Sequence, residues 1–277
     1  MGYKIIATIL TGMNTAKDAL DAAIKLAEDT DAHLDIHVIT INQSSLAYDL
    51  SGMSTPVVAA QTRDAIEERE QLEDWVQTRM QGEVVRWSMQ AAMVQSLVLG
   101  NYLAEKLRFS DLVVLGRPYQ DDLELAGLVE NCMFIAGCPV LMIPKGAGAP
   151  AMGGNVVLGW NDGTEALSAT RAALPFLRRA AETDICIIDP PTQGHDQSDP
   201  GSGMAQFLTR HGATPVIKLI AKTEGNVADT LLRCARDSGA ALIVSGAYGH
   251  SRLREAVFGG TTRSLLENAE VPILMAR

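Results

Sequence analysis

A chain of 277 residues, 47% hydrophobic and 20% charged, has the composition of a folded protein with one large domain or two ordinary ones. Its net charge of −10 argues against broad electrostatic binding to nucleic acid or to anionic lipid, so we expect neither as a partner. The sequence contains no apolar run near the roughly 20 residues that span a bilayer, and its N-terminus lacks the layout of a signal peptide, so we expect a cytoplasmic location and no membrane association.

The first half of the sequence alternates apolar, β-branched runs with helical patterns, and it begins with a strand. Strands are predicted over residues 3–10, 34–41, 84–89, 112–115 and 139–143. Helices are predicted over residues 15–29, 57–81, 95–109 and 123–136. In the long second helix, the spacing of the apolar residues predicts an inward face made of Ile66, Leu72, Trp75 and Val76.

Residues 146–154 are rich in Gly, Pro and Ala without periodicity, and they are predicted to link a domain at 1–145 to a domain at 155–277. The second domain repeats the order of elements of the first. Its strands are predicted over residues 155–160, 184–188, 214–220, 241–245 and 272–275. Its helices are predicted over residues 164–179, 203–211, 226–237 and 262–269.

Echoes between the two halves indicate an internal duplication. DLVVLGRP at 111–118 matches ALIVSGAY at 241–248, and CPVLMIP at 138–144 matches VPILMAR at 271–277. Apolar strands that alternate with helices predict an α/β fold with two tandem doubly wound domains, each with a five-stranded parallel sheet. Ligands in such folds bind beyond the carboxyl ends of the strands, and Gly246 lies there in the second half.

The segment that follows the fourth strand of the second half combines glycines, hydroxyls and a helix. Its notable residues are Gly246, Gly249, Gly259, Gly260, Thr261 and Thr262. Glycine lets the backbone approach a ligand closely, and a helix N-terminus offers unpaired N–H groups and a positive dipole end to an anion. The pattern therefore predicts a phosphate site. The alternative is that the glycines only form tight turns that cap the strand and the helix.

This architecture and the terminal motif together resemble the universal stress protein A family in its tandem two-domain form. Nucleotide-binding members of that family carry G-x-x-G, nine residues, and then Gly followed by Ser or Thr. Gly246, Gly249 and Gly259 fit at this spacing, whereas the next position is Gly260 and the hydroxyls follow at 261 and 262. The resemblance implies a Rossmann-like strand order of 3-2-1-4-5 in each domain and a pseudo-twofold axis between the domains.

The resemblance also implies that an adenine nucleotide (ATP, ADP or AMP, with or without Mg²⁺) binds to the second domain. The family places an acidic residue after the first strand, and Gly-Trp-Asn-Asp-Gly-Thr offers Asn161 or Asp162 for this role. Asp162 is equally suited to the N-cap region of the following helix. Adenine is expected near the first and third strands, where Trp160 either stacks on it or packs in the core. The expected site also includes Ile188, Ile220 and His250, the last of which is otherwise a solvated surface residue.

The first half departs from this pattern. Its loop after the first strand, Ile-Leu-Thr-Gly-Met-Asn, contains no acid. Tyr119 stands where the motif needs its second glycine, and Leu128 and Val129 replace the hydroxyls. We therefore expect that the first half has lost the nucleotide binding of the family. The equivalent crevice near Thr11 and Asn42 could still bind a different small molecule.

Catalytic signatures are missing from the sequence: it has no G-x-S-x-G elbow, no Walker lysine motif, no H-E-x-x-H and no paired catalytic carboxylates. We expect no catalytic residue and at most weak ATP hydrolysis. The four cysteines form no C-x-x-C pair, so no metal site is expected and the cysteines are predicted to be small buried residues.

Two functions fit the sequence. The first is a stress-response protein whose bound nucleotide changes its assembly or its affinity for an unknown protein partner. The second is a scaffold without a nucleotide, in which the halves form a fixed pseudo-dimer. Single-domain relatives pair through their last strands, so residues 141–143 are expected to approach residues 274–276 in either case. Two chains could also associate as a homodimer.

Overall fold

The computed structural model describes residues 2–42, 55–118, 122–190, 200–221, 226–247 and 260–277. The strands are β1 (Ile5–Leu10), β2 (His33–Asn42), β3 (Arg86–Gln95), β4 (Leu112–Gly116), β5 (Val140–Ile143), β6 (Val156–Gly159), β7 (Thr183–Ile188), β8 (Pro215–Ile220), β9 (Leu242–Gly246) and β10 (Ile273–Ala276). The helices are α1 (Met13–Thr30), α3 (Thr55–Met80), α4 (Leu99–Leu107), α5 (Leu123–Phe134), α6 (Thr164–Ala172), α7 (Leu174–Leu177), α8 (Ser202–Arg210), α9 (Val227–Asp237) and α10 (Gly260–Asn268), with a 3₁₀ turn, η1, at Ser96–Val98.

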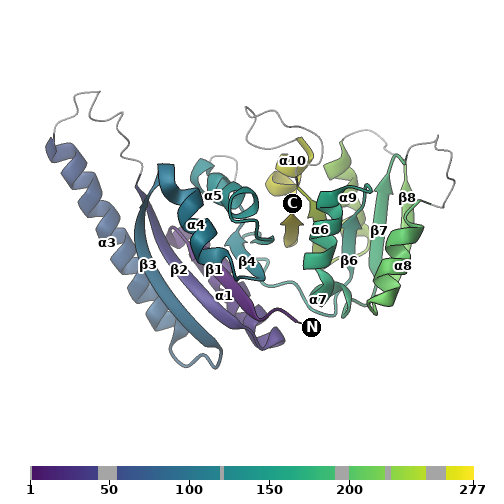
Figure 1. Ribbon diagram of the computed structural model, residues 1–277, viewed down its shortest axis with the longest axis horizontal. Helices are drawn as coiled ribbons and strands as arrows, with labels where there is room; N and C mark the ends of the chain where they lie inside the picture. The colour runs from purple at the N-terminus through teal and green to yellow at the C-terminus, as the bar shows by residue number, and fades with distance from the viewer. Residues whose placement is uncertain (1, 43–54, 119–121, 191–199, 222–225, 248–259) are drawn as a thin grey trace.

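All described strands belong to one ten-stranded sheet with the order β3-β2-β1-β4-β5-β10-β9-β6-β7-β8 (Figure 1). Counted from its own first strand, each half has the order 3-2-1-4-5, and the strands within a half are parallel. The predicted fold class is therefore confirmed.

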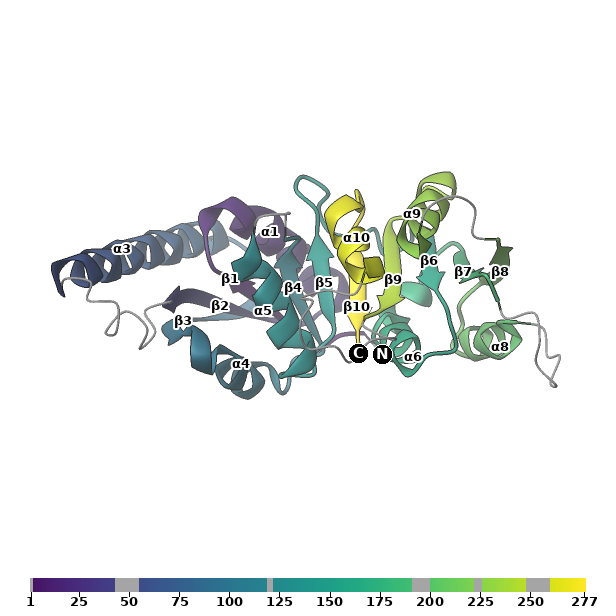
Figure 2. The same ribbon diagram turned by 90° about the horizontal axis from the view of Figure 1, so that it is seen from above.

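The halves join where β5 meets β10, side by side in the middle of Figure 2. This pair is antiparallel, with Leu141 opposite Leu274. The expected approach of these two segments is confirmed. Because both last strands are hydrogen-bonded to each other, this edge of each half is closed within the chain.

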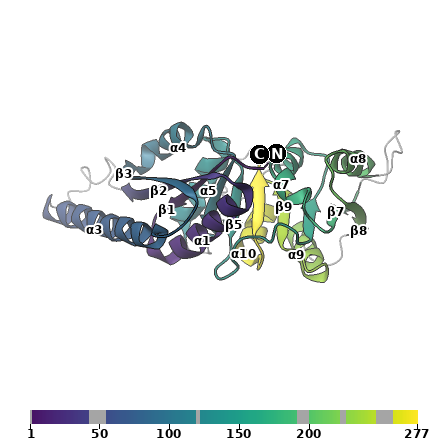
Figure 3. The same ribbon diagram turned by 90° about the horizontal axis from the view of Figure 1, so that it is seen from below.

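Helices cover both faces of the sheet, and two apolar clusters fill the space beneath them. One cluster includes residues from α1, α3, α6, α7 and α8, and the other includes residues from α4, α5, α9 and α10. The long helix α3 reaches beyond the sheet that it covers (Figures 1 and 3). Its predicted inward face is buried at Leu72 and Val76, whereas Ile66 and Trp75 are half-buried.

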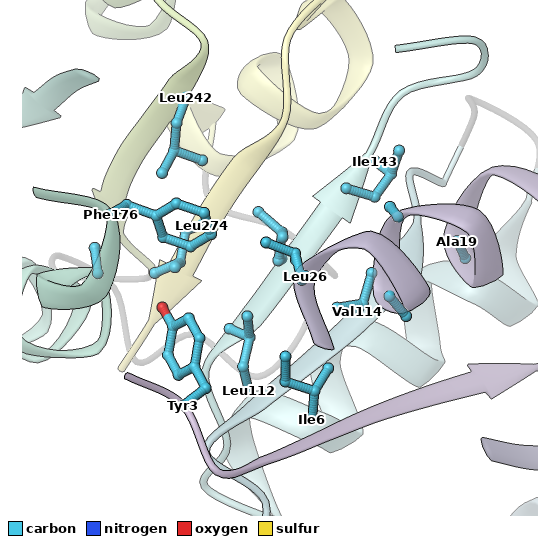
Figure 4. Close-up of a cluster of buried hydrophobic side chains, with 14 of the residues drawn as sticks. Tyr3, Ile6, Ala19, Leu26, Leu112, Val114, Ile143, Phe176, Leu242 and Leu274 are labelled. Atoms are coloured by element: carbon cyan, nitrogen blue, oxygen red, sulfur yellow. The ribbon is translucent and has the colours of Figure 1, made fainter. Parts of the chain in front are cut away.

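The junction between the halves is a continuous core rather than a hinge. Tyr3 and Phe176 come from different halves, and their ring centroids lie 5.9 Å apart. Leu26, Leu112 and Leu274 belong to the same buried cluster (Figure 4). The Tyr3 hydroxyl donates a hydrogen bond of 2.6 Å to the Ala172 carbonyl. Burial, with a smaller contribution from nearby charge, raises the pKa of Tyr3, so its hydroxyl remains a donor.

Two elements differ from their predicted bounds for local reasons. The helix predicted over 164–179 is interrupted between α6 and α7, because Pro175 lacks an N–H and its ring clashes with the preceding turn. Strand β3 continues to Gln95, where the sequence predicted that a helix begins. Every residue of β3 pairs with β2, so ladder hydrogen bonds outweigh the helical propensity of residues 91–95.

His37 is a buried titratable group in β2, with only 5% of its surface exposed. No described residue makes a hydrogen bond to either ring nitrogen. Burial lowers the pKa of His37 below its usual 6.5, and the positive charge of Lys106 acts in the same direction, whereas Asp35 opposes both.

Acidification is expected to destabilise the protein through His37. Because the folded pKa is lower than 6.5, the unfolded chain binds more protons below that pH, and stability is lost as the pH falls from about 6.5 towards the folded pKa. Urea unfolding of the parent protein and of His37→Leu at about pH 7.5 and about pH 5.5 measures the effect. The parent should lose more stability on acidification than the variant. Equal losses would assign the acid sensitivity to other groups.

Candidate functional site

The carboxyl ends of β6 and β9 are adjacent in the second half, with Gly159 opposite Ser245. At β6 the sheet order reverses, because β7 lies on one side of it and β9 on the other. This is the switch point at which doubly wound sheets open a crevice for a ligand. The segments that follow β6 and β9 are those in which the sequence predicted a nucleotide site.

The loop from β6 to α6 presents two polar side chains. The N–H of Gly163 donates to Asn161 Oδ1 at 3.0 Å, which fixes the turn. Asp162 has a left-handed backbone with φ of 58°, and its side chain is exposed. The N-cap of α6 is Gly163, without a side-chain capping bond. Asp162 thus lies in the N-cap region of α6, as its alternative expected, one residue before the N-cap.

Gly246 ends β9 directly against the first turn of α6. A Cβ at this position would lie 2.5 Å from the Ala166 nitrogen and 2.7 Å from the Glu165 carbonyl carbon. Gly116 has the equivalent place in the first half, where a Cβ would lie 2.7 Å from Thr15 Cβ. Close packing of strand and helix thus requires glycine in both halves, and the requirement holds without a ligand.

The N-terminus of α10 carries the hydroxyls of the motif. Gly260 is exposed, and a Cβ added there would meet no described atom within 4 Å. Thr261 is half-buried, whereas only 5% of Thr262 is exposed. Thr261 is therefore the better placed of the two hydroxyls to reach an anion. The first turn of α10 contains no acidic residue.

The matching helix of the first half, α5, has the opposite character at its N-terminus. Asp122 Oδ1 accepts a hydrogen bond of 2.9 Å from the N–H of Leu125, and Glu124 follows in the first turn. The Asp122 carboxylate thus already binds a free N–H at this helix N-terminus, and the negative charges there repel a second anion. Asp122 was not predicted from the sequence, although an aspartate before an apolar helical run is a common N-cap signal.

The structure brings some of the expected site residues together and separates others. Ile188 pairs with Ile220 at the carboxyl ends of β7 and β8, and both pack against the cluster beneath α9. Trp160 is half-buried and packs against the cluster on the other face. The core alternative for Trp160 therefore describes its position. Gly249, His250 and Gly259 lie outside the described residues.

Comparison with known proteins supplies the family. A model of the universal stress protein family matches residues 155–277. Residues 155–277, the second half of the chain, are therefore a universal stress protein domain. The universal stress protein Slr1230 of Synechocystis sp. (strain ATCC 27184 / PCC 6803 / Kazusa) is 36% identical over 53 residues, which is 19% of this chain and 18% of that relative. The match thus covers less than a fifth of the relative's length.

Solved universal stress proteins share the fold of the whole chain, the first half included. One from Archaeoglobus fulgidus DSM 4304 has a TM-score of 0.74 at 11% identity, over 99% of this chain and 96% of that chain. A putative one from Pseudomonas aeruginosa UCBPP-PA14 has a TM-score of 0.55 at 18% identity, over 99% and 93% of the two chains. At these identities the likeness concerns the fold alone.

Among the described residues, no group of three or more His, Cys, Asp and Glu side chains is arranged to hold a metal ion. Three of the cysteines are buried, and burial raises the pKa of the Cys138 thiol to about 11, which makes it a poor nucleophile. Within the described ranges, no helix combines the length and apolar character needed to cross a membrane.

Proposed function

We propose that this universal stress protein binds one adenine nucleotide (ATP, ADP or AMP) in its C-terminal half, and that the nucleotide changes its assembly or its affinity for a protein partner during stress. The proposal is supported by the contrast between the N-termini of α10 and α5, the last helices of the two halves. The first turn of α10 has Gly260 and Thr261 and no acid, whereas α5 is closed by Asp122 and Glu124. Of these two helix N-termini, that of α10 is the one suited to a phosphate.

In the proposed complex, the phosphates lie along Gly249 and residues 259–262, with His250 at their edge. Thr261 supplies the hydroxyl that replaces the expected serine, because Thr262 is buried. Asp162 or Asn161 contacts the ribose or adenine, which lies near Ile188 and Ile220. Mg²⁺ would arrive with the nucleotide and be held chiefly by its phosphates. Hydrolysis would be weak at most, and we propose a cytoplasmic location.

Gly260→Asp tests this proposal by giving α10 the acidic start that α5 has. An added Cβ meets no described atom within 4 Å, and a carboxylate at a helix N-terminus stabilises the helix by about 0.3 to 1 kcal/mol. The variant should therefore be at least as stable as the parent and yet fail to bind ATP. Gly260→Ala is the matched control, since it adds a side chain without a charge.

The measurement is a thermal shift with and without MgATP. Nucleotide at about 100 times its dissociation constant stabilises a protein by about 2.7 kcal/mol, which raises the melting temperature by several degrees. We expect this rise for the parent and for Gly260→Ala, and none for Gly260→Asp. A parent that shows no rise at millimolar ATP, or an aspartate variant that shows the full rise, contradicts the proposal.

A second candidate is a scaffold that binds no nucleotide, and the packing at Gly246 favours it because it explains this glycine without a ligand. The continuous core at the junction suits a fixed pseudo-dimer. A homodimer of such chains would need a surface other than β5 and β10, since these strands pair with each other. The mass of protein freshly purified from cells distinguishes the two candidates, because only the first carries a co-purified nucleotide.

A further inference from the structure

Arg117 connects the first half of the chain to α10 of the second half. It follows β4 directly, and only 8% of its surface is exposed. Its Nη1 donates a hydrogen bond of 2.8 Å to the carbonyl of Leu266, a residue 149 positions away. Leu266 lies near the end of α10 and is 3% exposed. The hydrogen bond is therefore buried and joins the halves.

The contact acts on the C-terminal end of α10. Carbonyls in the last turn of a helix lack helical N–H partners, and this end carries the negative pole of the helix dipole. A guanidinium satisfies the carbonyl of Leu266 and complements the dipole at the same point. Thr261 lies five residues earlier, about 7.5 Å along the axis. Because a short helix moves as a unit, a fixed C-terminal end also fixes the place of Thr261.

The equivalent position in the second half offers no such contact. The N–H of Arg117 donates to the Ile143 carbonyl at 2.8 Å, and the N–H of Ala247 donates to the Ala276 carbonyl at 3.0 Å, so the two residues occupy the same backbone place. Alanine has no side-chain donor. The second half instead reaches α5 through Arg277, whose guanidinium lies 4.6 Å from the ring centroid of Phe134. The hydrogen bond from Arg117 to Leu266 thus reaches the helix that carries the hydroxyls, and Ala247 has no side-chain donor that could make its counterpart to α5.

We propose that Arg117 is a positioning residue through which the first half of the chain sets the phosphate affinity of the second half. This inference rests on the nucleotide function proposed above. It also assigns a role to the altered glycine segment of the first half. Arg117, which directly follows Gly116, would not bind a ligand in the first half but would instead hold α10 of the second half in place.

The test compares the parent with Arg117→Met, Arg117→Lys and Arg179→Met. Arg179 is the control, because its Nη1 also donates a hydrogen bond between the halves, at 3.1 Å, but to the carbonyl of Asp29 in α1 rather than to α10. Hydrogen exchange without nucleotide measures the order of α10 against α5 and α9. Calorimetry measures the affinities for ATP and for adenosine, which lacks the phosphates.

For Arg117→Met we expect faster exchange in α10 and ATP binding weakened about fivefold or more, with adenosine binding unchanged. Arg117→Lys should partly restore the slow exchange in α10 and the ATP affinity. Arg179→Met should change neither the exchange in α10 nor the ATP affinity. Unchanged exchange in α10, or an equal loss of ATP and adenosine affinity, overturns the proposal, because general loosening affects both ligands. If the parent binds no ATP, the nucleotide function fails and the phosphate role of Arg117 with it, whereas the exchange data still decide whether Arg117 orders α10.

Discussion

Phe176→Ala is expected to lower the free energy of unfolding by about 3 to 5 kcal/mol, the usual cost of removing a fully buried phenylalanine. Phe176 is 1% exposed and belongs to the cluster that crosses the junction of the halves, where it faces Tyr3 (Figure 4). The cavity would open between two sets of elements that are far apart in the sequence. We therefore expect the loss of stability to be felt in both halves.

Urea unfolding followed by hydrogen exchange separates this outcome from a local one. Exchange should accelerate in β1 and β4 of the first half as well as in β6 and β9 of the second. Phe207→Ala is the control, because Phe207 is half-buried in α8, and it should cost less. If Phe176→Ala left exchange in the first half unchanged, the two halves would unfold as independent domains. The core at their junction would then not couple their stabilities.

Gly246→Val is expected to destabilise the protein by about 3 kcal/mol, at the upper end of the usual cost of overpacking. The obstacle is backbone rather than a flexible side chain, since the new Cβ would lie 2.5 Å from the Ala166 nitrogen. α6 would have to move away from β9 to make room. Midpoints of urea unfolding measure the effect.

Gly260→Ala is the matched control for this prediction, because an added Cβ meets no described atom within 4 Å. Its stability should stay within about 1 kcal/mol of the parent. If Gly246→Val were equally mild, the close approach of α6 to β9 would be wrong, and the glycine would need a ligand to explain it.

The fold was largely predictable because its periodic signals are strong and occur twice. Alternation of buried strands with helices placed almost every element, and the family resemblance supplied the strand order and the meeting of β5 with β10. The errors arose where local and tertiary preferences compete. Residues 91–95 suit a helix in isolation but pair with β2, and Pro175 divides a helix whose apolar pattern continues past it.

The site was less predictable, because its decisive features depend on packing. The motif identifies Gly246, but only the distance to α6 shows that strand–helix packing already requires glycine there. Thr261 and Thr262 are equivalent in the sequence, and the orientation of α10 on the core exposes one and buries the other. The contact of Arg117 with Leu266 spans both halves and follows only from their placement in one sheet.

The number of adenine nucleotides held by each chain tests the central claim most directly, and native mass spectrometry in the presence of ATP counts them. We predict one nucleotide per chain for the parent and for Gly260→Ala, and none for Gly260→Asp, whose charge blocks the start of α10. Two nucleotides per chain would contradict the proposal that Asp122 and Glu124 keep a nucleotide from the first half. A parent chain that carries none would contradict the nucleotide function itself.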